Sequence, residues 1–111
     1  LSEALNEWSE KSKVGILIDE EKIPVRADVK AACEMLGIDP LEVGNEGKII
    51  IGVVREKAEE LLETLKQTKE GKNAEIIGEA TKQFKEVAIQ TTVGGKRILP
   101  PPIGDPIPRI C

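Results

Sequence analysis

The sequence predicts one α/β (α+β) domain, in which helices pack on one face of a mixed β-sheet to form a sandwich. Segments with helical spacing of apolar residues alternate along the chain with short β-branched runs. The chain has 111 residues, which is enough for a single modest core. Hydrophobic residues make up 40% of it but aromatic residues only 2%, so we expect a core of aliphatic side chains.

Helices are predicted over residues 1–12, 26–37 and 55–68, because each segment has apolar residues at amphipathic spacing. The second helix is expected to stop at Gly37, since glycine readily takes the left-handed conformation that ends a helix. The apolar stripes of the three helices are, in chain order, Leu1, Ala4, Leu5 and Trp8; Val29, Ala32, Cys33 and Leu36; and Ala58, Leu61, Leu62 and Leu65.

Strands are predicted over residues 14–25, 47–54, 74–81 and 84–93. A polar turn at residues 19–22 interrupts the first, and the last ends at a Gly94-Gly95 turn. Residues 47–54 read GKIIIGVV, a nearly continuous apolar run. Such runs are typical of strands that are covered on both faces, so we expect this one to be the central strand.

Charge and composition argue against several classes of function. The net charge is −4, whereas a nucleic-acid-binding surface is basic, so no nucleic acid is expected as a partner. No apolar run approaches the roughly 20 residues that a membrane span needs. The chain has no histidine and only two cysteines, which makes a zinc site improbable and excludes Ser-His or Cys-His pairs within it. We expect a reducing, cytoplasmic setting.

The end of the chain differs in composition from the rest. Five of the seven prolines lie between Pro100 and Pro108, so we divide the chain into a domain over residues 1–99 and an extended tail over residues 100–111. Proline-rich segments are semi-rigid and extend about 3.1 Å per residue, which would carry Cys111 on the order of 30 Å from its anchor. Composition alone leaves two interpretations of Cys111 open, a functional thiol or an incidental residue.

Two other features have a structural and a functional interpretation. Cys33 lies in a helical apolar stripe, so we interpret it as a small buried apolar residue. The segment GNEGK, residues 44–48, is interpreted first as a tight turn, because its two glycines permit positive φ angles. In the alternative interpretation, the same loop presents the Glu46 carboxylate at the start of the predicted central strand.

The segments ALNEW, GILIDEEKIPVR, AACEMLGIDPLEVGNEGK, EIIGEA, GGKRIL and the final PRIC together carry a family resemblance. The chain resembles the C-terminal domain of the HypE family of hydrogenase maturation factors, which belong to the PurM-like superfamily of ATP-dependent enzymes. PRIC is the most specific of these elements. The tail departs from the family pattern at Pro100, Pro101 and Pro102, which implies a stiffer hinge.

The resemblance implies a chemistry for the terminal cysteine. Cys111 would accept a carbamoyl group from the partner HypF, and ATP-dependent dehydration would give a protein-bound thiocyanate. The cyano group would then pass to iron on the HypC–HypD complex, as the source of the cyanide ligand of [NiFe]-hydrogenase. Arg109 and Ile110 would guide the tail, and Arg109 would partly offset the charge of the terminal carboxylate.

The resemblance also implies what this sequence does not contain. ATP and Mg²⁺ would be bound chiefly by an N-terminal domain outside it, so we expect this fragment alone to bind no ATP tightly and to be inactive. As our own hypothesis, Glu46 is the base that removes amide protons and Asn45 orients it. Two alternatives remain, a non-catalytic sulfur or acyl carrier and an interaction domain with an incidental terminal thiol.

Overall fold

A computed structural model describes residues 1–103 of the chain. Its centre is a sheet of four strands in the order β2-β1-β3-β4. The strands are β1 (Gly15–Asp19), β2 (Gly78–Thr81), β3 (Val87–Gln90) and β4 (Lys96–Ile98). β1 is antiparallel to β2 and parallel to β3, and β3 is antiparallel to β4, so the predicted mixed sheet is confirmed.

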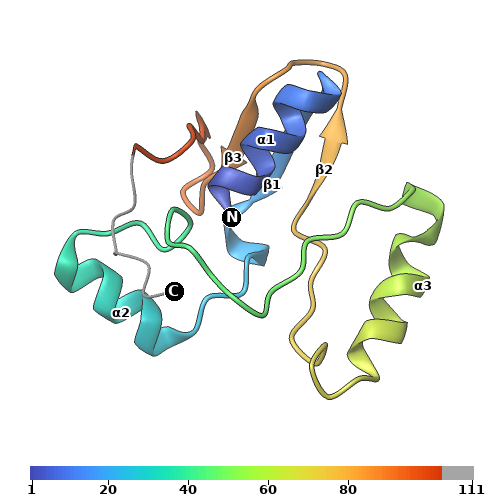
Figure 1. The fold of residues 1–111 in the computed structure, drawn as a ribbon, viewed down its shortest axis with the longest axis horizontal. Helices are drawn as coiled ribbons and strands as arrows, with labels where there is room; N and C mark the ends of the chain where they lie inside the picture. Colours follow the sequence, from blue (N-terminus) through green and yellow to red (C-terminus); the bar gives the residue numbers. More distant parts are fainter. Residues whose placement is uncertain (104–111) are drawn as a thin grey trace.

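The three α-helices differ in how they relate to this sheet (Figure 1). Helix α1 (Ser2–Ser12) packs on β1 and β3, whereas α2 (Ala27–Leu36) and α3 (Arg55–Lys66) stand on opposite sides of the molecule. All three helices were predicted, and α2 ends as expected at Gly37, which has a φ of 68°. We expected all the helices to pack on one face of the sheet. Of the three, α1 has the extensive contacts with the strands.

The core lies between α1 and the inner strands and is aliphatic, as the composition predicted. Ile89 and Leu99 have no exposed surface, and Ile18 is 1% exposed. Close strand packing leaves no room for a side chain at two positions of the sheet. A Cβ at Gly15 would lie 2.3 Å from the Phe84 carbonyl oxygen, and one at Gly78 would lie 2.2 Å from that of Leu17.

The buried face of α1 is only partly the predicted one: Leu5 is buried and Leu1 packs against the core, but Trp8 does not belong to it. Trp8 is 41% exposed, and the residues that the helix buries are Ser2, Leu5 and Ser9. Serine fits at position 9 because its hydroxyl lies 2.7 Å from the Val14 carbonyl oxygen and 2.9 Å from that of Lys85, so its one proton has an acceptor. A hydrophobic-spacing rule overlooks such residues, since a satisfied hydroxyl costs little to bury.

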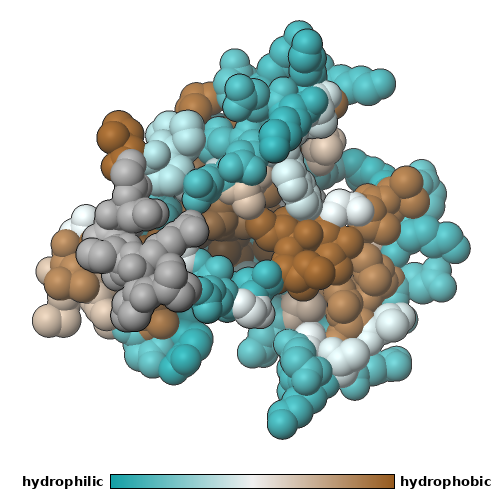
Figure 2. Space-filling model, viewed as in Figure 1, coloured by the Kyte–Doolittle hydropathy of each residue, from teal (hydrophilic) through white to brown (hydrophobic). Residues whose placement is uncertain are grey.

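The prediction for residues 47–54 was wrong. The segment forms no strand, and it pairs with none of the strands in the described part of the chain. Ile49 is 80% exposed and Val54 63%, so the run is not covered on both faces. Figure 2 shows apolar side chains gathered on the face where this run and α3 lie. Its β-branched composition favours an extended backbone, but pairing also needs a neighbouring strand, which residues 1–103 do not supply.

The remaining predicted strands are shorter in the structure than in the sequence analysis. The segment over residues 14–25 ends its strand at Asp19, where a 3-10 turn, η1 (Glu20–Lys22), takes the place of the expected polar turn. The Gly94-Gly95 turn is present and joins β3 to β4: Thr91 N–H donates to the Gly95 carbonyl at 2.7 Å. No helix among the described residues is long and apolar enough to cross a bilayer.

Candidate functional site

The loop that carries Asn45 and Glu46 is anchored at its beginning. The Asp39 carboxylate accepts a hydrogen bond from the Leu41 N–H at 2.9 Å, which fixes the turn at Pro40. Leu41 is buried, and its carbonyl oxygen accepts from the Ser2 N–H at 2.9 Å, which ties the loop to the start of α1. The loop therefore leaves the core at a defined point before it reaches the candidate residues.

Asn45 and Glu46 both lie on the exposed part of this loop. The Asn45 side-chain amide donates to the Val43 carbonyl oxygen at 3.1 Å, so it stabilises its own loop. Gly47 has a φ of 72°, which is the left-handed conformation that the two-glycine pattern predicted for this segment. The expected positive φ is thus confirmed, but residues 46–47 form a bend with no strand after it and not a tight strand-entry turn. The catalytic roles of Glu46 and Asn45 stay predictions.

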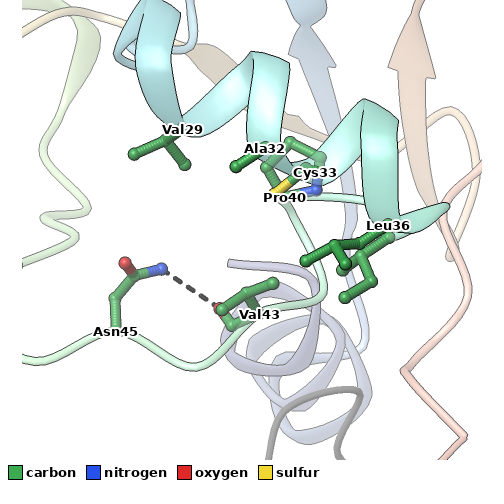
Figure 3. Close-up of a pocket in the computed structure, with 8 residues that line it drawn as sticks. Val29, Ala32, Cys33, Leu36, Pro40, Val43 and Asn45 are labelled. Carbon is green, nitrogen blue, oxygen red and sulfur yellow. Dashed lines mark hydrogen bonds between the residues drawn. The ribbon is translucent and has the colours of Figure 1, made fainter.

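An apolar hollow of about 210 Å³ lies between α2 and this loop (Figure 3). Cys33 forms part of its wall and is 7% exposed with a free thiol, which confirms the interpretation of Cys33 as a small buried apolar residue. Asn45 is the polar residue at the rim. The residues that line the hollow are Val29, Ala32, Cys33, Leu36, Ile38, Pro40, Val43 and Asn45.

The root of the proline-rich tail is held firmly, and this is a feature that sequence reasoning missed. Leu99 is fully buried, and its N–H donates to the Val87 carbonyl at 2.8 Å, which extends the β3–β4 pairing by one bond. The Leu99 carbonyl accepts a hydrogen bond of 2.9 Å from the side-chain amide of Asn6. The available signal was an asparagine beside Leu5 on the inner side of a predicted helix.

The residues with the most specific predicted roles are Cys111, Arg109 and Ile110, and all three lie outside the described residues. The roles of these tail residues therefore stay predictions. The same holds for the division of the chain into a domain over residues 1–99 and a tail over residues 100–111. What the structure does describe is the point from which the tail starts.

Two features of the described residues bear on a site for ATP with Mg²⁺. Magnesium prefers several oxygen ligands, usually carboxylates and phosphate. No group of three or more Asp, Glu, His or Cys side chains within residues 1–103 could hold a metal ion. The glycine pair at residues 94–95 closes a hairpin turn on its own backbone and opens no helix, so it cannot cradle phosphate as a P-loop does. No step involving nucleotide is therefore assigned to these residues.

This mixed sheet with a helix packed on it matches one known class of domain. The model of the family described as AIR synthase related protein, C-terminal domain, matches residues 1–90. The chain belongs to this family.

Within that class, the relatives of this chain are HypE proteins. It is 55% identical over 111 residues to a hydrogenase expression/formation protein of Methanocaldococcus jannaschii, covering 100% of this chain and 33% of the relative. It is 44% identical over 112 residues to the carbamoyl dehydratase HypE of Azotobacter vinelandii, again covering 100% and 33%. The predicted resemblance to HypE is confirmed, and the chain spans about a third of the length of these curated relatives.

Solved HypE structures have the same fold. A crystal structure of the hydrogenase maturation protein HypE superposes with a TM-score of 0.92 at 35% identity, covering 100% of this chain and 37% of that one. A HypE–HypF complex gives 0.86 at 50% identity, covering 91% and 33%. HypE in complex with ATP gives 0.89 at 33% identity, covering 96% and 34%. The PurM-like fold class is thereby confirmed.

Proposed function

We propose that this chain is the part of a HypE-type carbamoyl dehydratase that carries the acceptor cysteine on its C-terminal tail. The observation that carries this proposal is the extent of the similarity. The alignments with both the archaeal relative and the Azotobacter HypE cover the whole chain, so they include its last residue, Cys111. A relative named for carbamoyl dehydration, aligned through the terminal cysteine, supports a role for that thiol in the reaction.

The chemistry proceeds through two covalent states of the Cys111 sulfur. First, the thiolate attacks the carbonyl carbon of a carbamoyl donor. The S–C bond forms as the bond between that carbon and the donor's leaving group breaks, which gives a thiocarbamate. Then the carboxamide loses its oxygen and both N–H protons, the elements of water, and becomes a thiocyanate. ATP bound with Mg²⁺ elsewhere in the full-length protein drives this loss. When the cyano group passes to iron, the S–C bond breaks and the sulfur leaves as thiolate.

The residues of this chain have distinct tasks in the proposal. Arg109 offsets the terminal carboxylate, which would otherwise discourage thiolate formation at Cys111. Ile110 helps guide the tail into the site that it enters. Glu46, presented on an exposed loop, accepts an amide proton from the thiocarbamate, and Asn45 orients it through the loop backbone. The chain has no histidine, so the general base must be a carboxylate or come from another domain.

The partners follow from the two transfers. HypF is the carbamoyl donor, which is supported by the solved complex of a HypE relative with HypF. The HypC–HypD complex is the acceptor of the cyano group. We place this chemistry in a reducing cytoplasm, because Cys111 must stay a free thiol between turnovers.

One experiment tests the proposal directly. Full-length protein containing this chain is incubated with HypF, carbamoyl phosphate and ATP, and the tail peptide is weighed by mass spectrometry. We expect a gain of one carbamoyl group at Cys111, followed by loss of one water when the protein's own ATP is turned over. Cys111→Ser should abolish both adducts, while Cys33→Ser is the matched control because that thiol is buried. An unmodified tail, or a persulfide, would instead support the carrier or interaction-domain alternatives.

Glu46 is tested in the same assay. With Glu46→Gln, carbamoylation of Cys111 should proceed at the normal rate, because that step uses HypF. Conversion to thiocyanate should slow by about a hundredfold, within the range typical of losing a general base. Thiocyanate formation at an unchanged rate in this variant would remove Glu46 from the site while leaving the role of Cys111 intact.

A further inference from the structure

We propose that Asn6 is a positioning residue for the tail: it fixes the direction in which the chain leaves the domain after Leu99, and so sets where Cys111 can go. The inference rests on the proposed function of Cys111. It concerns described residues only, and the contact that carries it joins a helix at the start of the sequence to a residue 93 positions later.

The side-chain amide of Asn6 makes two bonds to backbone carbonyls. Its Nδ2 donates to the Ser2 carbonyl one turn earlier in α1, at 2.8 Å, and to the Leu99 carbonyl at 2.9 Å. The first bond fixes the rotamer of Asn6, and the second uses the remaining N–H of the same amide. Asn6 is half-buried, so both bonds form where water competes less.

The Leu99 carbonyl is a sensitive point of the chain, because it belongs to the peptide group that joins Leu99 to Pro100. Its orientation is set by ψ of Leu99, and ψ of Leu99 sets the direction of Pro100. The Leu99 side chain and N–H are already fixed in the sheet, so ψ is the first rotation that can redirect the tail, and Pro100 confines it to the extended range. The bond from Asn6 restrains this rotation.

The three prolines that follow Leu99 keep the chain in the direction that Leu99 sets. Each proline has φ fixed near −65°, and a residue before proline is restricted to extended conformations. Pro100, Pro101 and Pro102 thus form a stiff segment that extends roughly 9 Å, at about 3.1 Å per residue. These prolines line a depression of about 600 Å³ beside Glu3, Asn6 and Glu7 of α1, and Pro102 is half-buried there. A change in ψ of Leu99 would swing this whole segment.

The functional consequence concerns the effective concentration of the Cys111 thiol at the site that it must enter. Cys111 lies twelve residues beyond Leu99, so a freely pivoting tail would spread the thiol over a large volume. A root with a fixed direction confines it to a smaller region and favours entry into a site within the same protein. HypF, in contrast, arrives from solution and can follow the tail. The dehydration step should therefore depend on Asn6 more strongly than carbamoylation does.

The test uses full-length protein and a matched pair of variants on α1. Asn6→Ala removes the restraint on Leu99. Ser9→Ala is the control, because the Ser9 hydroxyl also binds backbone from the inner side of α1, with one proton for the carbonyls of Val14 and Lys85, and does not hold the tail root. Both variants should lower the unfolding midpoint by similar amounts. All rates are compared at a temperature well below the lower midpoint.

With Asn6→Ala we expect conversion of the thiocarbamate to thiocyanate to slow by about tenfold at saturating ATP, while the KM for ATP and the carbamoylation rate stay unchanged. Ser9→Ala should leave all three values near those of the parent protein. Equal rates of conversion in the two variants would overturn the inference. If the parent protein forms no adduct at Cys111, the proposed function itself has failed, and the two failures are thus distinguishable.

A second measurement does not depend on turnover. Spin labels on Cys111 and on Lys11→Cys, in a Cys33→Ala background, report the distance between the tail end and α1 by pulsed electron paramagnetic resonance. Asn6→Ala and the isosteric Asn6→Asp, which lacks the amide donor, should both broaden this distance distribution. Ser9→Ala should not. An unchanged distribution in both Asn6 variants would contradict the proposal even if their activity falls.

Discussion

Two regions of the molecule have similar sequence character but opposite packing. The sheet with α1 encloses a core in which Ile18, Ile89 and Leu99 are at most 1% exposed. The arm, which we define as residues 47–70 with the apolar run and α3, contains no fully buried residue, and Ile50 is its one partly buried residue that packs against the core. The difference teaches that apolar composition produces a core only where the topology places a second apolar surface opposite the first.

The contrast is also energetic. Fully burying an isoleucine side chain is worth about 1.5–3 kcal/mol, and Ile89 gains all of this because none of it is exposed. Ile49 remains 80% exposed and gains little. Replacing Ile89 and Ile49 by a smaller residue should therefore change the free energy of unfolding by very different amounts, and the difference measures how unequally the two regions are packed.

The largest effect is expected in the core. In the 111-residue chain, Ile89→Ala should lower the free energy of unfolding by about 2–5 kcal/mol, because it removes buried methyl groups and leaves a cavity. Ile49→Ala is the matched change in the arm and should cost less than about 0.5 kcal/mol. Urea unfolding followed by circular dichroism measures both. Similar costs for the two variants would mean that the arm is packed in solution.

The next effect uses two glycines with the same steric problem. A Cβ at Gly78 would lie 2.2 Å from the Leu17 carbonyl oxygen, and one at Gly71 would lie 2.1 Å from that of Leu65. Gly78→Ala pushes apart two paired strands, so we expect a loss of about 1–3 kcal/mol in the free energy of unfolding. Gly71→Ala can be relieved by fraying the end of α3, and it should change helicity but not the global unfolding midpoint.

A smaller effect concerns hydroxyl groups. Ser9→Ala leaves the partly buried carbonyls of Val14 and Lys85 without this donor, which should cost about 1–2 kcal/mol. In the arm, the Thr64 hydroxyl donates to the Glu60 carbonyl at 3.0 Å on an exposed helix surface. Thr64→Ala should be neutral or slightly stabilising, because alanine has the higher helix propensity. Thermal unfolding of both variants gives the comparison, and a large loss for Thr64→Ala would contradict it.

The success of the sequence-based predictions also differs between the core and the arm. Periodicity located all three helices, and alternation with β-branched runs predicted a mixed sheet, because these patterns depend on local geometry. The central position assigned to residues 47–54 failed, since pairing is a property of two segments and only one was considered. The inner face of α1 differs from the predicted one for a related reason. Ser9 and Asn6 lie on it because they bind backbone carbonyls of distant segments.

Some features of the candidate site could be predicted from local sequence, and others could not. The left-handed conformation at Gly47 and the burial of Cys33 could be predicted, because each follows from residue type and immediate neighbours. The contact between Asn6 and Leu99 could not, since nothing within either segment specifies the other across 93 positions. The resemblance to HypE named the tail residues, but only geometry could indicate that the tail has a fixed root.

The smallest effect tests whether the arm behaves as an independent unit. Helix α3 begins at Val54, which has an extended backbone and cannot cap the first N–H groups with its side chain. Val54→Asp supplies an acceptor at this position and should stabilise the helix by about 0.5–2 kcal/mol. Amide exchange in α3 should slow, because those amides open locally and not by global unfolding. Val54→Ala is the control that changes size without adding an acceptor.

The same variant also decides whether the comparison itself is right. If the arm is independent, Val54→Asp slows exchange only within α3, and the exchange of β1 and β3 amides stays as it was. A stabilisation that spreads to the sheet would show that α3 and the core unfold together. That result would mean that the contacts of Ile50 with the core and of Arg55 with Glu79 of β2 couple the arm to the sheet in one cooperative structure.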